Sequence, residues 1–169
     1  MNFVGIDPGL KGAIAIISHG TGKLRLIPFS SLHEKDQKFF HLPLLTPEVV
    51  SLRGHSFIFM ENVHAMTGQG VSSSFSFGWN TGMIEGVLQY EGFQVNKVLP
   101  LTWQKELGLL NCTDGKEFKS VGSKKAARKK AYVQKAKELF PNDAARINLE
   151  TADAILIAEY ARKVFYGRL

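Results

Sequence analysis

Short apolar runs separated by turn residues dominate the first hundred positions of the chain, and this pattern is typical of β-strands. Five such runs predict strands at 3–7, 13–17, 23–29, 56–62 and 93–98. Pro8, Gly9 and Gly12 lie between the first two runs and predict a tight turn. The first three strands therefore follow one another closely enough to be antiparallel neighbours.

Helical spacing replaces the strand pattern in the second half of the chain. It predicts a short helix opened by Pro47 and ending before Arg53, and longer helices over about 77–92, 123–140 and 150–165. Gly78, Gly82 and Gly86 recur every four residues. Because glycine inside a helix costs up to about 1 kcal/mol relative to alanine, this stripe predicts close packing against a sheet or a partner helix.

The composition fits one globular unit. The chain has 169 residues, 44% of them hydrophobic, so we expect a single domain over 1–169 with a real core. No apolar run reaches the roughly 18 residues of a membrane span, and no signal-type segment opens the chain. Cys112 is the only cysteine, which excludes an internal disulfide and a cysteine-based zinc site.

Positive charge is concentrated in one segment. Residues 97–137 hold eleven Lys or Arg against three acids, a balance of +8, whereas the whole chain carries +6. A basic segment on a nearly neutral body is the pattern expected of a protein that binds a phosphate backbone. The alternative is an ordinary solvated helix face.

Four carboxylates border apolar segments that are predicted to form the core. Asp7 and Glu61 each end an apolar strand, and Glu150 and Asp153 lie three apart near the start of the last predicted helix, on one side of it. If the strands are neighbours and the helix crosses them, the four converge. A carboxylate cluster needs shared protons or cations at neutral pH, and hard oxygen ligands suit two Mg²⁺ or Mn²⁺ ions. Such a pair of ions supports phosphodiester hydrolysis.

Asp7 and Glu150 also have a plainer interpretation. Asp7 before Pro8 and Gly9 is a common turn former, and Asn148 is a candidate cap for the last helix, with Glu150 near its positive end. Glu61 after FIFM has no evident local role. The five histidines show no metal-ligand spacing, and neither a serine-hydrolase elbow nor a P-loop is present.

The motifs GIDPGLKGAIAI, ENVHAM with the following GQGVSSSFSFG, PLTWQKELGL and ETADAILIAEYAR occur in an order that resembles the RuvC-type Holliday junction resolvases, particularly the phage-borne and plastid-like branches. The resemblance implies an α/β RNase H-like fold, with a mixed five-stranded sheet whose first three strands are antiparallel, flanked by helices. It implies a homodimer that cuts opposed strands of a four-way DNA junction. A location in the cytoplasm of a bacterium or phage-infected cell follows, with an organelle as the alternative.

The resemblance also assigns roles to residues. The acidic tetrad becomes Asp7, Glu61, Glu150 and Asp153, which would hold two Mg²⁺ ions, with Mn²⁺ as a substitute. Lysines near the scissile phosphate are matched by Lys105 and by Lys124 or Lys125, although Gln104 stands where a lysine often follows the tryptophan. The remaining predicted DNA contacts are His64, Phe75 and Phe77 as stacking side chains, and Lys116, Lys119, Arg128, Lys129 and Lys130 along the backbone.

The sequence therefore predicts a Mg²⁺-dependent endonuclease for branched DNA, with Holliday junctions as substrate. Two alternatives stay open: a nuclease of the same superfamily for flaps, other branches or RNA–DNA hybrids, and a silent module that only binds branched DNA. An actin-like nucleotide-binding protein is disfavoured because 169 residues are too few for its two lobes. The glycine stripe is a candidate dimer seam.

Overall fold

A five-stranded sheet forms the centre of the molecule in the computed structural model, which describes residues 1–32, 39–64, 68, 70–115 and 117–167. The strands are β1 (Asn2–Asp7), β2 (Ala13–Ser18), β3 (Leu24–Pro28), β4 (Ser56–Glu61) and β5 (Val95–Val98). Their order is β3-β2-β1-β4-β5. The first three are antiparallel, and β4 and β5 run parallel to β1, so the sheet is mixed as the sequence predicts.

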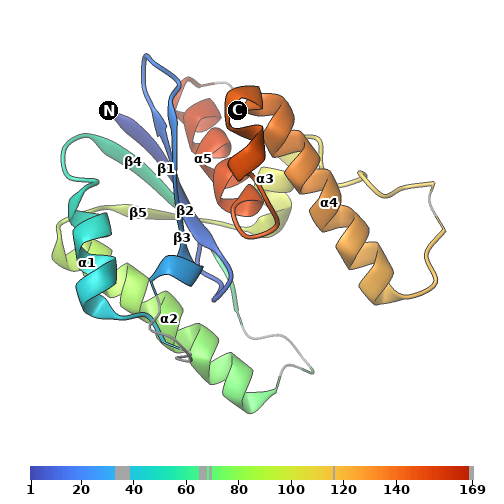
Figure 1. Ribbon diagram of the computed structural model, residues 1–169, viewed down its shortest axis with the longest axis horizontal. Helices are drawn as coiled ribbons and strands as arrows, with labels where there is room; N and C mark the ends of the chain where they lie inside the picture. Colours follow the sequence, from blue (N-terminus) through green and yellow to red (C-terminus); the bar gives the residue numbers. More distant parts are fainter. Residues whose placement is uncertain (33–38, 65–67, 69, 116, 168–169) are drawn as a thin grey trace.

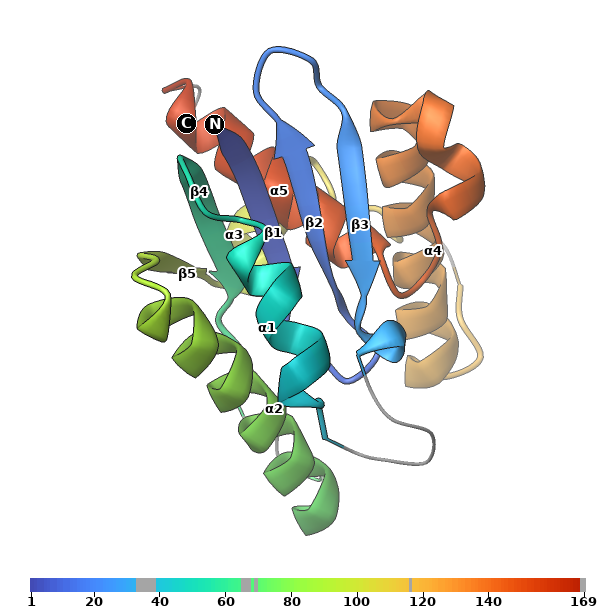
Figure 2. The same cartoon turned by 60° about the vertical axis from the view of Figure 1, so that its left-hand side comes forward.

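Helices cover both faces of this sheet (Figure 1). One layer contains α3 (Pro100–Glu106), α4 (Val121–Leu139) and α5 (Ala152–Phe165), and the other contains α1 (Leu42–Val50) and α2 (Val71–Tyr90). Figure 2 shows α1 and α2 in front of the sheet, with α5 behind it. Two short 3-10 helices, η1 (Phe29–Ser31) and η2 (Pro141–Arg146), complete the elements.

The alternation of side chains along β1 explains the two layers. Val4 and Ile6 belong to the buried cluster under α1 and α2, whereas Phe3 belongs to the cluster under α5. Gly5 lies on the α5 side, where an added Cβ would be 2.2 Å from the Ala154 carbonyl oxygen. The helix thus approaches the strand as closely as a backbone allows.

Three helix predictions need correction. Helix α1 begins at Leu42, so Pro43 occupies its opening turn and Pro47 lies inside it. Helix α2 begins at Val71 rather than near Phe77. The sequence pattern misses its first turns because they are rich in serine and show no apolar period. The last helix begins at Ala152 rather than at residue 150.

The glycine stripe of α2 does not pack against the sheet. Ser76, Asn80, Ile84 and Leu88 form the buried line of this helix, and an added Cβ at Gly78, Gly82 or Gly86 would meet no atom within 4 Å. The buried Asn80 is satisfied because its Oδ1 accepts a hydrogen bond from the Phe40 N–H at 3.0 Å. The part of the prediction that placed the stripe against the sheet is wrong.

Among the described residues, no helix is long and apolar enough to cross a membrane.

Candidate active site

Two neighbouring parallel strands end in carboxylates that face the same layer. Ile6 of β1 pairs with Met60 of β4, so Asp7 and Glu61 follow at adjacent strand ends. Asp7 is four residues after Phe3 and Glu61 is two after Phe59, so by the period of two each acid shares its face with a side chain that packs toward α5. The sheet therefore carries its two terminal carboxylates to the α5 side.

Helix α5 supplies a third carboxylate in its first turn. Asp153 is 4% exposed, and its Oδ2 accepts a hydrogen bond from the Lys129 Nζ of α4. Lys129 is on the inward line of α4, three residues before the buried Tyr132 and seven before the buried Ala136. The packing of α4 on α5 thus brings an ammonium group among three carboxylates.

Hydrogen bonds from the chain fix the two strand-end acids. The Gly9 N–H donates to Asp7 Oδ1 at 3.2 Å, in the turn after β1. The indole N–H of Trp103, which is fully buried, donates to Glu61 Oε1 at 3.0 Å. The Trp103 ring is in turn in edge contact with Tyr132, with centroids 5.4 Å apart. A single contact chain therefore links α3 and α4 to Glu61.

Burial and mutual repulsion make both acids hard to ionise. Burial, followed by the charge of Asp153, raises the pKa of Asp7 to about 6, although Lys129 and the Gly9 N–H oppose the increase. Burial, followed by the charge of Asp7, raises the pKa of Glu61 to about 7, against the Trp103 hydrogen bond. Proteins place perturbed carboxylates of this kind at functional sites.

The raised pKa values predict that the metal-free protein loses stability as pH rises from 5 to 8. Asp7 and Glu61 bind protons more tightly in the folded chain than in the unfolded chain, where their pKa values are 3.8 and 4.5. Their destabilising effect is therefore absent below pH 4 and complete above pH 7. Between pH 5 and pH 8 in EDTA, the free energy of unfolding should decrease more in the wild type than in the double variant Asp7→Asn/Glu61→Gln. We expect the difference between the two decreases to be on the order of 2 kcal/mol. Urea denaturation at pH 5, 6.5 and 8 measures this difference, and equal slopes for the two proteins would contradict it.

Glu150 makes its side-chain hydrogen bond to the segment after β3. Its Oε1 accepts a hydrogen bond from the Ser30 N–H at 2.9 Å, and it lines a hollow of about 330 Å³ with Lys11, Ser30 and Leu149. Residue 150 is in the turn before α5, where the Asn148 side chain accepts hydrogen bonds from the N–H groups of Glu150 and Thr151. The shared helix face predicted for Glu150 and Asp153 is therefore wrong, because the helix starts after Glu150.

A second hollow opens directly over Asp7. It measures about 430 Å³ and shares Lys11 and Leu149 with the hollow beside Glu150. Its rim is basic: it is lined by Asp7, Lys11, Leu149 and, from α4, Gly122, Lys125, Ala126, Lys129 and Lys130. Four lysines thus surround the entrance to one carboxylate, which is a suitable setting for a phosphate group.

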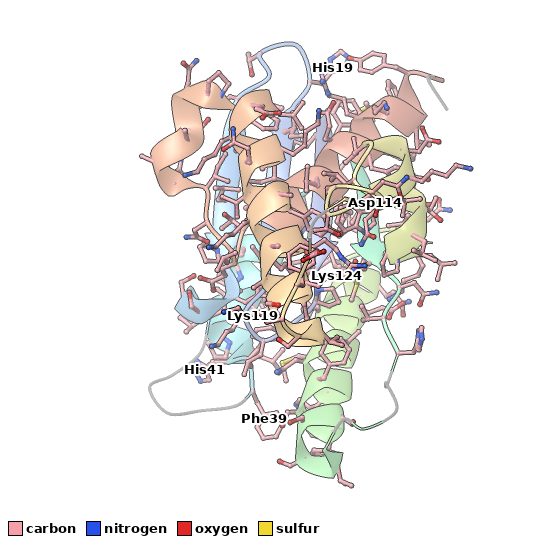
Figure 3. The ribbon with its side chains drawn as sticks, turned by 90° about the vertical axis from the view of Figure 1, so that its right-hand side faces the viewer. His19, Phe39, His41, Asp114, Lys119 and Lys124 are labelled. Carbon is pink, nitrogen blue, oxygen red and sulfur yellow. The ribbon has the colours of Figure 1, made fainter. Side chains whose placement is uncertain are left out.

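The other predicted lysines lie farther out. Lys105 is exposed on α3, while its neighbours Trp103 and Gln104 turn inward. Lys124 is exposed in the first turn of α4, and Lys119 is exposed two residues before this helix (Figure 3). Arg128 is also exposed, and Lys116 lies outside the described residues.

The predicted stacking side chains differ in their surroundings. His64 is exposed in the segment after β4, and Phe77 is half-buried on α2. Phe75 is 60% exposed, and its ring centroid is 6.3 Å from that of Phe39 and 5.9 Å from that of Trp79. Phe39 is labelled in Figure 3.

Sequence reasoning misses three residues of this site. It assigns Lys129 to DNA backbone contact rather than to the acids, although the spacing of Lys129 to Tyr132 and Ala136 marks the inward line of α4. Trp103 is the partner of Glu61, and Lys11 belongs to the turn after Asp7. No pattern in the sequence indicates the Trp103 contact, because the two residues are 42 positions apart.

Carboxylate oxygens are suitable ligands for a hard divalent ion, but Asp7, Glu61 and Asp153 are not arranged in this structure to bind one ion together. No group of three or more His, Cys, Asp or Glu side chains in the described part of the chain could hold a metal ion as it stands. Asp153 Oδ1, however, is buried and finds no hydrogen-bond partner among the described residues. A buried carboxylate oxygen without a partner is costly, and a cation would satisfy it.

The order and direction of the strands, with helices on both faces, define an α/β protein with an RNase H-like fold. One solved structure with this fold is T. thermophilus RuvC in complex with Holliday junction substrate. It matches with a TM-score of 0.60 and 17% sequence identity, over 99% of this chain and 96% of that chain. No protein-family model matches the sequence, and no curated protein matches it.

Proposed function

We propose that this protein is a structure-selective endonuclease that resolves four-way DNA junctions. The observation that carries the proposal is the meeting of Asp7, Glu61 and Asp153 beneath a hollow rimmed by lysines. The fold shared with a RuvC bound to a Holliday junction supports the choice of substrate. Assignment to the phage-borne or plastid-like branches stays a prediction.

Asp7, Glu61 and Asp153 are the residues that would hold divalent metal. Mg²⁺, or Mn²⁺ in its place, supplies Lewis-acid activation of the scissile phosphate and of the attacking water when bound. Glu150 would join this set only after releasing the Ser30 N–H. We therefore propose three ligands from the present arrangement, with Glu150 as a fourth in the DNA complex.

The chain itself provides position and charge. The Trp103 and Gly9 N–H groups orient the Glu61 and Asp7 carboxylates. These carboxylates are therefore in position before the substrate binds. Lys125 and Lys130 extend from α4 at the hollow, where they would hold the DNA backbone and offset charge that develops on the phosphate.

The exposed face of α2 supports the predicted homodimer. Gly78, Gly82 and Gly86 are open to solvent on the side away from the sheet, and Phe75 and Trp79 are more than half exposed beside them. A second α2 could approach this face closely, and two copies would place two active sites on one junction. Sedimentation showing only monomer at the concentration that supports cleavage would contradict this arrangement.

A cleavage assay tests the proposed function. Labelled four-way junction, linear duplex, flap and RNA–DNA hybrid of equal length are incubated with the protein in Mg²⁺ or in EDTA. We expect paired symmetric nicks in the junction only, and none in EDTA. Preferred cleavage of the flap or hybrid would support the assignment as a nuclease but contradict the assignment of the junction as its substrate. Binding without cleavage in Mg²⁺ would favour the silent binding module.

Junction binding should depend on salt, and Lys130 should contribute to that dependence. Each lost lysine–phosphate contact lowers the slope of log affinity against log salt by about 0.9, so we expect Lys130→Ala to lower it by about 1. Lys23→Ala is the matched control, since Lys23 is also exposed but lines a different hollow. Fluorescence anisotropy across a salt series gives both slopes. Equal slopes for Lys130→Ala and wild type would contradict a contact between Lys130 and the DNA backbone at this hollow.

A further inference from the structure

Lys129 is placed differently from every other lysine at the hollow. Its Nζ donates to Asp153 Oδ2, and the side chain of Asp153 is 6% exposed while that of Lys129 is 36% exposed. Lys11, Lys125 and Lys130, which line the same hollow, are exposed. One ammonium therefore sits inside the acidic group, and the others remain at its rim.

All three carboxylates act on this ammonium. Burial lowers the pKa of Lys129, but Asp153, and then Asp7 and Glu61, raise it above its ordinary value. Lys129 in turn opposes the increase in the pKa values of Asp7 and Glu61. The lysine is thus charged, and it supplies the positive charge that the three acids need in order to remain close together.

The hollow over Asp7 offers a second position for the Lys129 ammonium. Its side chain lines the hollow that opens over Asp7, so the flexible four-carbon stem can carry the ammonium from Asp153 into that hollow while α4 stays in place. Departure of the ammonium would free Asp153 Oδ2, next to an Oδ1 that already lacks a partner among the described residues. Both oxygens of this carboxylate would then be available to a cation.

We propose that Lys129 is an internal counter-ion, which holds Asp7, Glu61 and Asp153 together in the metal-free protein and is exchanged for a divalent ion when that ion binds. The released ammonium then faces the hollow, where it meets a DNA phosphate. This inference rests on the proposed function, because it takes the three acids to be metal ligands. It makes Lys129 a positioning residue and couples metal binding to DNA binding.

Mn²⁺ titration of Lys129→Met tests the exchange without any measurement of cleavage. In wild type the ion must displace the ammonium, and in the variant it need not, so we expect Lys129→Met to bind Mn²⁺ at least about tenfold more tightly by calorimetry. Lys130→Met is the matched control: it removes one charge from the same hollow but no contact with Asp153. We expect its affinity to change by less than about threefold.

Thermal unfolding provides an independent readout. In EDTA, Lys129→Met should melt below wild type, because the carboxylates lose their counter-ion, and saturating Mn²⁺ should raise its melting temperature by more than it raises that of wild type. Lys129→Met that binds Mn²⁺ no more tightly than Lys130→Met, or more weakly than wild type, would overturn the proposal. Wild type that binds no Mn²⁺ would overturn both this proposal and the metal-dependent part of the proposed function.

A measurement on wild type covers the case in which Lys129→Met fails to fold. Lysine side chains labelled with ¹³C at Cε give one NMR signal each, and Lys129→Arg identifies the signal of Lys129. Addition of Mg²⁺ should shift this signal more than that of any other lysine, since its ammonium leaves Asp153. An unchanged Lys129 signal at saturating Mg²⁺ would overturn the exchange while leaving junction cleavage, tested separately, unaffected.

Discussion

Asp7→Asn is expected to lower the rate of junction cleavage on the order of 10³-fold or more while leaving junction binding nearly unchanged. The asparagine keeps the shape of the side chain and one oxygen that can accept from the Gly9 N–H. It removes the negative charge that would bind a divalent ion between β1 and β4. Loss of several kcal/mol of transition-state stabilisation corresponds to a decrease of this size. Single-turnover cleavage of a labelled junction in Mg²⁺ measures it.

The control for this prediction is the same substitution at an exposed acid. Asp114→Asn removes one negative charge from the basic segment, on the exposed loop before α4. Its cleavage rate should stay within about twofold of wild type, as expected for a substitution at an exposed surface acid. Equal rates for Asp7→Asn and wild type would remove Asp7 from the reaction and, with it, the proposed metal site.

The same substitution should make the metal-free protein more stable above pH 7. Ionised Asp7 is disfavoured there first by burial and then by repulsion from Asp153 and Glu61, and asparagine removes both costs. A variant that gains stability while losing activity shows that the charge is kept for function. The site therefore stores unfavourable electrostatics that binding of a cation would relieve.

Gly5→Ala is expected to lower the free energy of unfolding by about 3 kcal/mol, which corresponds to a melting temperature roughly 6–12 °C lower. The new Cβ would be 2.2 Å from both the Ala154 carbonyl oxygen and the Ala158 nitrogen. These are backbone atoms, so relief requires α5 to move away from β1 rather than a side chain to rotate. Differential scanning calorimetry measures the loss.

Displacement of α5 should also reach the active site. Asp153 is one residue before Ala154, so the helix shift that accommodates the added Cβ moves Asp153 relative to Asp7. We expect the folded Gly5→Ala protein to cleave more slowly than wild type at a temperature well below its unfolding transition. Gly86→Ala is the control for stability alone, because its Cβ would meet no atom within 4 Å and alanine favours a helix by up to about 1 kcal/mol. It is not a control for cleavage, since Gly86 lies on the face proposed for the dimer. A Gly5→Ala protein as stable as Gly86→Ala would contradict the close contact of α5 with β1.

Local pattern predicts the strands of this protein well and the ends of its helices less well. The starts and ends of β1, β2 and β4 agree with the apolar runs to within one residue, because alternation and turn residues mark them clearly. Helix α3 is not predicted, since seven residues are too few to show a helical period. The predicted start of α1 is misplaced because two prolines compete to open the helix.

The apolar runs alone place Asp7 and Glu61 at strand ends, and they predict that the two acids meet only if the two strands are neighbours. Each ends an apolar strand, and a period of two carries both side chains to the same face as Phe3 and Phe59. The parallel pairing of β1 with β4 brings the two acids together, and the packing of the helices selects the charges that join them. Lys129 and Trp103 reach the acids through the packing of α4 and α3 on α5, whereas Glu150 stays with Ser30 because α5 begins two residues later. Contacts between residues far apart in the chain depend on how whole elements pack, and no local period encodes that.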